Sequence, residues 1–332
     1  MAEIKKTTYG ILLANTGTPD EPTPKAVRRY LAQFLSDSRV IEFPRWLWLP
    51  LLYGIILRVR PRRSARLYQR VWDERGSPLL YHTQDLAEKL QDALRDQIAE
   101  ADVHIVVGMR YGNPSIKSAL AELRDKGATH LFILPIFPQH SDTTSGTIVK
   151  AVFDELKSWR WMPSVQTISE YHDRSAHIHA VAKSIRAYWA QNPRAKKLLF
   201  SFHGIPQDYV EKGDPYQAQC LRSAALVAEE LDLGAGDWVA TFQSRFGPQE
   251  WLQPYTDETL KELGSEKLTS LDVVCPGFAV DCLETVDEIG HEGRKVFQEA
   301  GGGDFAYIPA LNATDLHVQA LSEIILENLC QK

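Results

Sequence analysis

The sequence predicts an α/β protein made of two doubly wound domains, each with a mainly parallel four-stranded sheet. Short apolar runs alternate along the chain with amphipathic stretches of helical period, and this alternation is typical of parallel sheets with right-handed crossovers. The runs Val103–Met109 and Leu131–Phe137 are almost continuously apolar, as expected of strands that are covered on both faces. A chain of 332 residues has the length of two domains or of one large α/β unit.

The candidate strands divide into four before and four after the region around Ser164. They are Tyr9–Thr16, Val103–Arg110, His130–Phe137, Val165–Tyr171, Lys197–His203, Trp238–Ser244, Leu271–Cys275 and Phe305–Ile308. We therefore expect a Rossmann-like N-terminal domain over residues 1–165 and a Rossmann-like C-terminal domain over residues 166–314.

Amphipathic stretches between these strands are the candidate helices. They include Pro24–Leu35, Ser115–Lys126, Thr144–Trp159, Ala176–Gln191, Tyr216–Leu231, Asp257–Leu263, Leu283–Glu299 and Asp315–Leu329. The last of them opens the C-terminal segment 315–332, which we expect to pack back on the N-terminal domain.

The composition excludes several classes of protein. A net charge of −6 and an isoelectric point near 6.0 argue against nonspecific nucleic-acid binding, which needs a positive field. The four cysteines include no C-x-x-C pair, so they predict neither a disulfide framework nor a zinc or iron–sulfur centre. Because the N-terminal residues also lack the pattern of a signal peptide, we expect a cytoplasmic protein.

The stretch Phe43–Arg66 departs from the α/β pattern. Residues 46–57 are apolar except for Pro50 and Gly54, and five arginines follow at positions 58, 60, 62, 63 and 66. A bilayer span needs about 20 apolar residues, so this stretch is too short to cross. Aromatic residues beside a basic cluster suit a membrane interface, and a hydrophobic helix tucked onto the domain is the alternative. Peripheral membrane contact through 46–66 therefore stays open.

A histidine stands at the end of a buried strand. In open α/β sheets ligands bind beyond the carboxyl ends of the strands, and His203 lies at such an end, followed by Gly204. A lone histidine there is more often structural than catalytic, so the interpretation needs partners. Other strand ends combine polar residues with glycine or proline, namely Ala14–Pro19, Gly108–Pro114, Phe137–Gly146, Phe242–Pro248 and Cys275–Glu284.

Three glutamates follow the seventh strand at helical spacing. Glu284, Glu288 and Glu292 stand at i, i+4 and i+8 on one helix face. Like charges at this spacing destabilise an isolated helix by about 0.2–0.5 kcal/mol per pair. One interpretation is a solvent-exposed acidic stripe. The other is an oxygen-lined path for a divalent cation with Glu284 at the inner end, close to His203, where one imidazole and one carboxylate bind a first-row metal weakly.

Other familiar motifs are absent from the sequence. No phosphate loop, no G-x-G-x-x-G after a strand and no G-x-S-x-G elbow occurs. His177 and His179 lie two apart near a helix start, and we expect both at the surface.

Several of these segments resemble the ferrochelatase family. "LLFSFHGIPQDYVEKGDPY" is similar to the family's histidine motif and "GFAVDCLETVDEI" to its glutamate motif. "LLANTGTPDEPT", "RGSPL", "GMRYGNPSI", "FPQHSDTTSG" and "FQSRFGPQEWLQPYTDETL" match as well, so the resemblance covers nearly the whole chain. It implies a chelatase-like fold of two Rossmann-like halves with a porphyrin cleft between them. It also implies insertion of Fe²⁺ into protoporphyrin IX to give protohaem with release of two protons, the last step of haem biosynthesis.

The resemblance also assigns residues to roles. It places His203 and Glu284 at the metallation centre as the catalytic pair. A second set of residues would handle metal or line the porphyrin cleft: Glu288 and Glu292 in the metal-moving row, and Thr16, Arg110, Tyr111, Ser141 and Phe278 in or near the cleft. A porphyrin loses two pyrrole protons as the metal enters, so we expect His203 to accept a proton and leave open whether it also ligates iron.

Departures from the family pattern refine the expectation. Animal members carry a C-terminal cysteine set for an iron–sulfur cluster, whereas this chain has only Cys330 there, so we expect no cluster and no cofactor. Members that use coproporphyrin carry tyrosine where this chain has Thr16, which favours protoporphyrin. Cys282 stands where animal members have histidine, so a ligand role there is doubtful. The apolar stretch 46–57 corresponds to the family's lip over the cleft, which offers a third explanation for it.

Three rival functions keep the fold but change the task. They are a coproporphyrin ferrochelatase, a chelatase for another tetrapyrrole and metal, and a non-catalytic porphyrin or haem carrier. A carrier needs an axial ligand but no acidic row, so the three glutamates favour an enzyme. We expect a cytoplasmic monomer, at most peripheral at the inner membrane face, with protoporphyrin IX and Fe²⁺ as substrates and no nucleic-acid partner.

Overall fold

The computed structural model describes residues 7–98 and 101–329. The chain forms two compact units. The first runs to Phe137 and resumes over Ser141–Glu170, and the second comprises Pro138–His140 and the residues from Tyr171 onward. The division predicted from the sequence, at residue 165, lies five residues before the end of the first unit.

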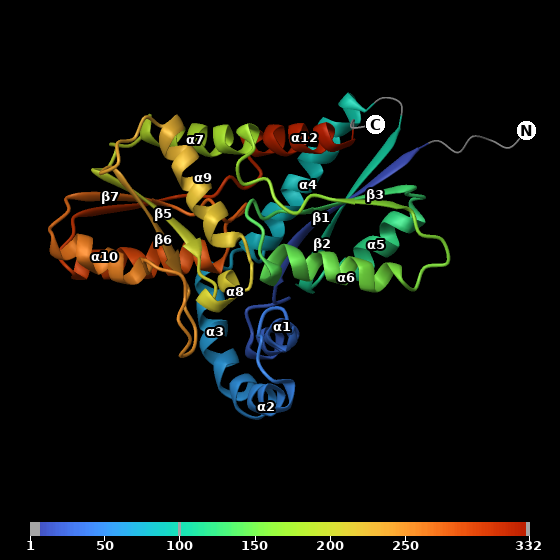
Figure 1. Ribbon diagram of the computed structural model, residues 1–332, viewed down its shortest axis with the longest axis horizontal. Helices are drawn as coiled ribbons and strands as arrows, with labels where there is room; N and C mark the ends of the chain where they lie inside the picture. The colour runs from blue at the N-terminus through green and yellow to red at the C-terminus, as the bar shows by residue number, and fades with distance from the viewer. Residues whose placement is uncertain (1–6, 99–100, 330–332) are drawn as a thin grey trace, which may run out of the picture. The chain divides into compact units, whose positions relative to one another are not determined.

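The first unit contains a parallel sheet of four strands in the order β2-β1-β3-β4. Its strands are β1 (Thr8–Thr18), β2 (Asp102–Gly112), β3 (His130–Pro135) and β4 (Ser164–Thr167). On one face, side chains such as Leu12, Val106 and Ile133 form a core with α5 (Ile116–Asp125) and α6 (Thr147–Leu156) (Figure 1).

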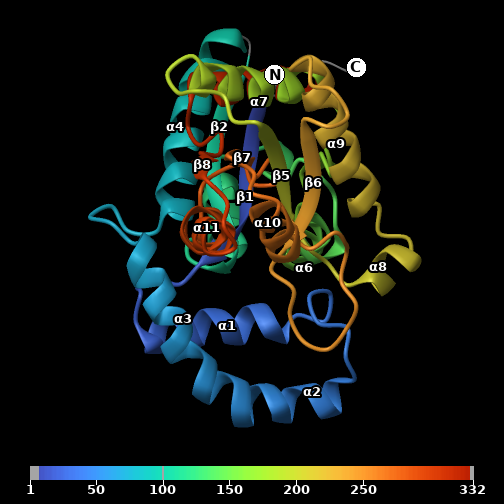
Figure 2. The same cartoon turned by 90° about the vertical axis from the view of Figure 1, so that its left-hand side faces the viewer.

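Helix α4 (Pro78–Gln97) packs on β1 and β2 from the opposite face (Figure 2). The sequence analysis does not predict this helix. The signals are nevertheless present, because Pro78 stands at the first helical position and buried leucines recur at 86, 90 and 94.

The segment that follows the first strand, which includes the apolar stretch 46–57, is helical. Helix α1 (Pro24–Ser36) begins at Thr23, whose side chain caps the backbone N–H of Ala26. Then α2 (Arg45–Leu51), the π-helix η1 (Leu52–Ile56) and α3 (Leu57–Val71) follow, and η1 and α3 pack on α1 (Figure 2).

Only one face of this segment is covered. Trp48, Leu52 and Leu57 are buried, and the indole N–H of Trp48 donates to the Leu35 carbonyl at 2.7 Å. Trp46 and Val59 remain 75% and 70% exposed. The tucked-helix interpretation therefore accounts for the buried face of the stretch but not for its exposed apolar side chains. None of the helices in the described ranges combines the length and the apolarity that a membrane crossing needs.

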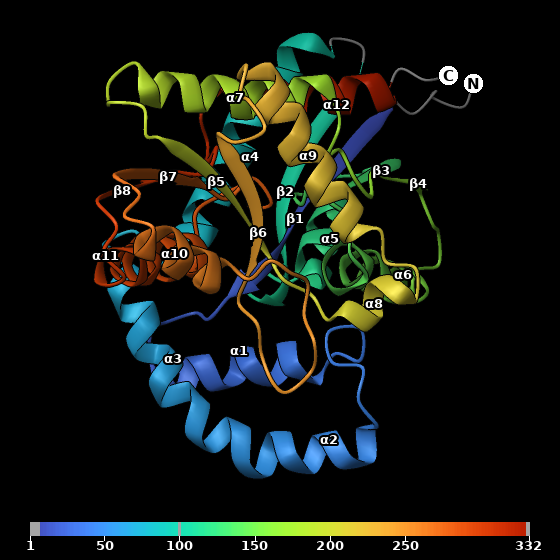
Figure 3. The same cartoon turned by 60° about the vertical axis from the view of Figure 1, so that its left-hand side comes forward.

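The second unit has its own parallel four-stranded sheet, in the order β6-β5-β7-β8 (Figure 3). Its strands are β5 (Lys197–His203), β6 (Trp238–Gln243), β7 (Ser270–Val274) and β8 (Asp304–Ile308). With the sheet of the first unit, this confirms the predicted fold class.

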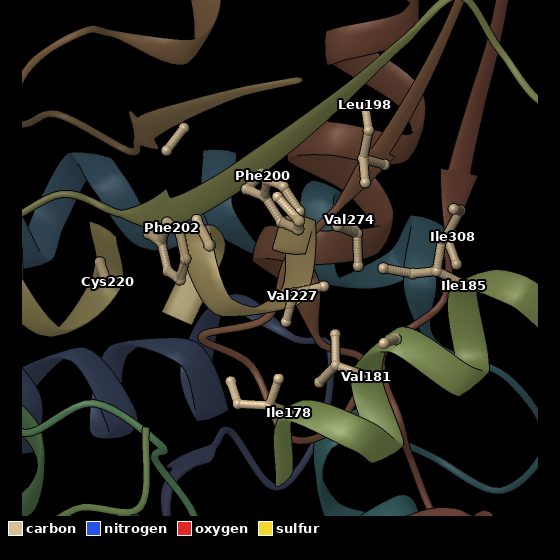
Figure 4. Close-up of a cluster of buried hydrophobic side chains, with 14 of the residues drawn as sticks. Ile178, Val181, Ile185, Leu198, Phe200, Phe202, Cys220, Val227, Val274 and Ile308 are labelled. Carbon is tan, nitrogen blue, oxygen red and sulfur yellow. The ribbon is translucent and has the colours of Figure 1, made fainter. Parts of the chain in front are cut away.

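Alternation along β5 divides the second unit into two cores. Leu198, Phe200 and Phe202 pack against α7 (Ser175–Trp189) and α9 (Tyr216–Glu230), as Figure 4 shows. Leu199 faces the other way and joins a second core with three helical elements, which are α10 (Thr256–Ser265), the π-helix η3 (Glu284–Gly293) and α11 (Arg294–Glu299).

Two expectations for this unit are wrong. Helix α12 (Asp315–Leu329) packs on α7 and belongs to the second unit, rather than to the first, because its Ala320 joins the core on the α7 face of that sheet. His177 is buried in α7 and only 3% exposed, whereas His179 is exposed as expected.

Two predicted α-helices contain π-helical turns. The segment predicted at 144–159 is η2 (Asp142–Gly146) followed by α6, and the segment predicted at 283–299 is η3 followed by α11. A π-helix has i→i+5 hydrogen bonds and commonly marks a functional site. A short helix, α8 (Gln207–Glu211), follows β5.

Candidate active site

The strand alternation that buries Leu199 also places a row of polar side chains on one face of the second sheet. Ser201 and His203 follow Leu199 at two-residue steps in β5, and Thr241 and Gln243 occupy the same positions in the neighbouring strand β6. His203 pairs in register with Gln243. The polar row therefore ends at the carboxyl edge of the sheet, on the face that η3 covers.

Gly204 allows β5 and β6 to stay close just beyond His203. Its N–H donates to the Gln243 carbonyl at 2.7 Å. A Cβ at this position would lie 3.0 Å from that carbonyl oxygen and 3.2 Å from the ring of Trp251, which leaves no room for a side chain without movement. The glycine after the histidine thus keeps His203 at a fixed position on the sheet edge.

The imidazole of His203 has one nitrogen engaged. Its Nδ1 lies 2.6 Å from the Gly204 carbonyl oxygen, which can only accept, so in the neutral ring Nδ1 carries the hydrogen. The lone pair is then on Nε2, and that atom is free to accept a proton or to bind a metal. The side chain is only partly buried, as either role requires.

Glu284 is the first residue of η3, and a buried carboxylate three positions earlier fixes the start of this helix. Asp281 accepts hydrogen bonds from the Thr285 hydroxyl at 2.9 Å, from the Tyr307 hydroxyl at 2.6 Å and from the Asn312 amide at 2.7 Å. These three donors satisfy the buried charge and attach η3 to β8.

Glu288 lies one turn further along η3. The Ser244 hydroxyl donates to its carboxylate at 2.6 Å. Burial raises the pKa of Glu288 above its usual value, and Glu284 raises it further, whereas the Ser244 hydrogen bond and the charge of His203 oppose that shift. His203 and Glu284 therefore both interact electrostatically with Glu288.

Glu292 is exposed at the outer end of the row, and Glu284 and Glu288 are partly buried. No three histidine, cysteine, aspartate or glutamate side chains within the described residues come together as a metal site, and this includes the predicted set of His203 and the three glutamates. The four side chains are a series of separate groups rather than one metal-binding cage.

Gln243 and Ser244 are the residues that the sequence analysis leaves without a role. The Gln243 side chain accepts from the Ser201 hydroxyl at 2.7 Å and donates to the Glu284 carbonyl at 2.9 Å. Thr256 extends the same buried network to Ser201 and Thr241. Alternate polar residues at the end of an otherwise apolar strand are the signal in the sequence that could have pointed to Gln243.

Three of the predicted substrate-binding residues lie at the carboxyl edge of the first sheet. Arg110 and Tyr111 end β2, and Thr16 stands on β1 between two residues that pair with that part of β2. Arg110 forms an ion pair with the buried Asp37, and the Tyr111 hydroxyl donates to the same carboxylate at 3.0 Å. Burial raises the pKa of Tyr111, which keeps its phenol protonated.

The other two predicted residues lie at the ends of further strands. Ser141 is buried at the start of η2, where its hydroxyl accepts from the Thr143 N–H at 3.2 Å. Phe278 follows β7 in the second unit, packs against the core on the η3 face and is partly exposed. Both follow strands that end at the carboxyl edge of their own sheet.

The cysteines near the site are poor metal ligands. Burial raises the pKa of the Cys275 and Cys282 thiols well above the usual value, and the nearby Glu284 raises that of Cys282 further. Both thiols are therefore protonated at neutral pH. Cys330, on which the expectation of no iron–sulfur cluster depends, lies outside the described residues.

The two four-stranded parallel sheets with flanking helices form a fold that solved chelatases share. The chain resembles SirB from Bacillus subtilis solved with Fe³⁺, with a TM-score of 0.58 and 12% identity over 98% of this chain and 96% of that one. It also resembles CbiX, described as the terminal enzyme of sirohaem biosynthesis in denitrifying bacteria, with a TM-score of 0.53 and 12% identity over 98% of this chain and 100% of the other. At this identity the likeness establishes the fold alone.

Sequence similarity identifies the family within this fold. The ferrochelatase family model matches residues 8–329. A ferrochelatase of Thioalkalivibrio sulfidiphilus is 52% identical over 96% of this chain and 86% of its own length, and one of Methylococcus capsulatus is 50% identical over 94% of each. The chain belongs to the ferrochelatase family, the lyases that insert a metal into porphyrin in haem biosynthesis.

Proposed function

We propose that the porphyrin is protoporphyrin IX and that the metal is Fe²⁺, so that the product is protohaem and two protons are released. The observation that carries this proposal is the His203 imidazole, whose Nδ1 is engaged by Gly204, together with Glu288, which interacts with both His203 and Glu284. An imidazole base and a nearby carboxylate are the two groups that metal insertion into a free-base porphyrin needs.

In the mechanism that we propose, His203 accepts a pyrrole proton on Nε2. Its Nδ1–H remains bonded to the Gly204 carbonyl, which also stabilises the imidazolium that forms. Fe²⁺ would be passed from the exposed Glu292 to Glu288 and then to Glu284. Separate carboxylates bind a divalent cation weakly, which suits an ion that must be released at each step.

The porphyrin would contact the residues that end the strands of the first sheet. Arg110 supplies a positive charge for a carboxylate of the macrocycle, although Asp37 neutralises part of that charge. Thr16 and Tyr111 would lie near the ring, as would Ser141 and, in the second unit, Phe278. The threonine at position 16, where coproporphyrin users have tyrosine, supports protoporphyrin as the substrate.

Anaerobic turnover tests this proposal. Purified protein is mixed with excess Fe²⁺ and either protoporphyrin IX or coproporphyrin III, and the loss of free-base porphyrin fluorescence is followed over many turnovers. We expect a higher kcat/KM with protoporphyrin. A preference for coproporphyrin would overturn the substrate assignment, and tight porphyrin binding without turnover would make the protein a carrier.

We also propose peripheral contact with the inner membrane face through residues 46–66 of an otherwise cytoplasmic protein. Trp46, Ile55 and Val59 are 75%, 59% and 70% exposed on the α2–α3 segment. Exposed arginines, including Arg58 and Arg62, stand beside them. Aromatic and aliphatic side chains bordered by arginines fit an anionic lipid surface.

A further inference from the structure

Ser244 has a backbone conformation that serine rarely adopts. Its φ is +67°, in the left-handed region that glycine, asparagine and aspartate tolerate best. The non-glycine residues that share this conformation within the described ranges are Asp232, Lys267 and Asn312. Asp232 and Lys267 are exposed just after helices, and Asn312 is a residue type that accepts it readily. Ser244 is the member of this group whose side chain donates to a glutamate of the acidic row.

The left-handed conformation changes where the serine hydroxyl lies. If β6 continued, the side chain of Ser244 would lie on the opposite face of the sheet from Gln243, because side chains alternate along a strand. The strand instead ends at Gln243, and the Ser244 hydroxyl donates at 2.6 Å to Glu288 of η3, which covers the Gln243 face. A strained backbone that is kept in place by its surroundings is a recognised mark of a functional position.

Gln243 and Ser244 are consecutive at the end of β6, and they contact the first two residues of the acidic row, Glu284 and Glu288. Gln243 donates to the main-chain carbonyl of Glu284 and so fixes the start of η3, and its side chain also hydrogen-bonds to Glu288. Ser244 donates directly to the carboxylate of Glu288. The end of β6 therefore fixes both the helix and one of its acidic side chains.

We propose that Ser244 is a positioning residue, which holds the Glu288 carboxylate toward His203 and Glu284 so that iron passes from Glu288 to Glu284. This inference rests on the proposed function of the acidic row. Ser244 touches neither the metal nor the porphyrin in this proposal, and it acts through Glu288 alone.

Three variants test the proposal. Ser244→Ala removes the hydroxyl and keeps the strained backbone, and Ser244→Gly removes both. Asp232→Gly is the matched control, because it relieves a left-handed backbone (φ +56°) at a position that precedes β6, whereas Ser244 follows that strand. We expect kcat/KM for Fe²⁺ to fall about 10- to 100-fold in both Ser244 variants, as for loss of a hydrogen bond to a charged group, with KM for porphyrin unchanged. The Asp232 variant keeps the original rate.

The melting temperatures separate positioning from structural support. We expect Ser244→Gly to be at least as stable as Ser244→Ala, because glycine removes the backbone strain, and yet to be equally slow. Loss of activity that follows loss of stability would overturn the proposal. So would an unchanged kcat/KM for Fe²⁺ or a change in KM for porphyrin alone.

A double-mutant cycle tests whether Ser244 acts through Glu288. In a Glu288→Ala background we expect Ser244→Gly to change the rate by less than about twofold, since its partner is gone. The same 10- to 100-fold loss in both backgrounds would overturn the proposal. If Glu288→Ala alone is too slow to measure, crystal structures of Ser244→Gly decide, because an unmoved Glu288 carboxylate contradicts the inference. Failure of the unmodified protein to turn over would instead reject the proposed function.

Discussion

At the residue scale, the proposed chemistry depends on which ring nitrogen of His203 keeps its lone pair. The Gly204 carbonyl holds the hydrogen on Nδ1, so Nε2 is the basic atom. Replacing His203 by alanine removes that atom, and we expect turnover to fall about 10²- to 10⁴-fold, the usual contribution of a general base. The anaerobic fluorescence assay measures the loss, and the melting temperature should change little because the side chain is only partly buried at a strand end.

His291 provides the matched control for this prediction. It is an exposed histidine on η3, the same helix that carries Glu284. We expect His291→Ala to keep turnover within about twofold, as a surface substitution does. If His203→Ala retained more than a tenth of the original rate, His203 would not be the proton acceptor.

Gln243 joins a buried polar network at the end of β6. Replacing it by leucine removes the donor to the Glu284 carbonyl and the acceptor for the Ser201 hydroxyl, which are both partly or fully buried. Ser201 keeps its hydrogen bond to Thr256, but the Glu284 carbonyl loses the Gln243 donor. Leaving one buried polar group without a partner costs about 1–3 kcal/mol, so we expect the free energy of unfolding to fall by about 1–3 kcal/mol. Urea unfolding followed by tryptophan fluorescence measures this change. The exposed Gln191→Leu should stay within about 0.5 kcal/mol, and an equal effect of both variants would contradict the prediction.

At the element scale, the α7–α12 pair makes the second unit sensitive to acid. Burial lowers the pKa of His177 to about 3 and that of His317 to about 4. The charges of His317 and His172 lower the pKa of His177 further, the hydrogen bond of His317 to the Asn312 carbonyl opposes the shift of His317, and no carboxylate contributes to either shift. Because the unfolded chain protonates these histidines near pH 6.5, it binds more protons than the folded chain below that pH.

The sign of the pH dependence follows from that difference. The stabilisation by the two neutral histidines is complete above pH 6.5 and is lost as the pH falls from 6.5 toward 4. Each adds a slope of up to about 1.4 kcal/mol per pH unit, so we expect the free energy of unfolding to fall steeply between pH 6 and 4. His177→Leu should reduce that slope by about half, whereas substitution of the exposed His179 should not. A flat profile in the unmodified protein, measured by urea unfolding at several pH values, would contradict this account.

The α2–α3 segment leads to a membrane prediction at the same scale. Trp46→Ser removes an exposed apolar side chain without disturbing the core, since the buried Trp48 holds the helix on α1. Burial of a large apolar side chain contributes about 1.5–3 kcal/mol, so sedimentation with phosphatidylglycerol vesicles should weaken about tenfold or more.

The vesicle experiment has two kinds of control, one that changes the protein and one that changes the lipid and the salt. Trp161→Ser, which changes a tryptophan that is 59% exposed outside residues 46–66, should keep the original binding. Neutral phosphatidylcholine vesicles and high salt should both reduce binding, because each arginine near an anionic surface adds about 1 kcal/mol. Equal binding of the two tryptophan variants would show that residues 46–66 are not the contact.

The elements that could be predicted from the sequence are those whose pattern is local. Continuous apolar runs predicted β5 to the residue, and strand ends led directly to His203. The π-helix η3 could not be predicted, because its i→i+5 bonds depend on distant partners such as Gln243, which binds the Glu284 carbonyl. Burial of His177 was missed for the same reason, since a histidine near a helix start carries no local sign that α12 covers it.

At the scale of the whole molecule, most candidate residues for the two substrates separate by unit, with Phe278 and His203 of the second unit as the porphyrin-side exceptions. Arg110 and Thr16 belong to the first unit, and the acidic row belongs to the second. If each unit binds one substrate, a substitution in one unit should change KM for that substrate alone. Arg110→Lys keeps a charge beside Asp37 but loses the guanidinium fork that binds carboxylates, so it tests the porphyrin side without leaving a buried charge unpaired.

We expect Arg110→Lys to raise KM for protoporphyrin about 10-fold, the loss of one good charge-assisted hydrogen bond, and to leave KM for Fe²⁺ unchanged. We expect Glu292→Gln to raise KM for Fe²⁺ about two- to fivefold and to leave KM for protoporphyrin unchanged. The effect is smaller because Glu292 is exposed and its field is screened by water. Initial rates over a grid of both substrate concentrations measure the two constants together. If either variant changed both constants equally, the units would not divide the substrates, and Arg110 would act on the metal step through the structure of the protein rather than by binding porphyrin.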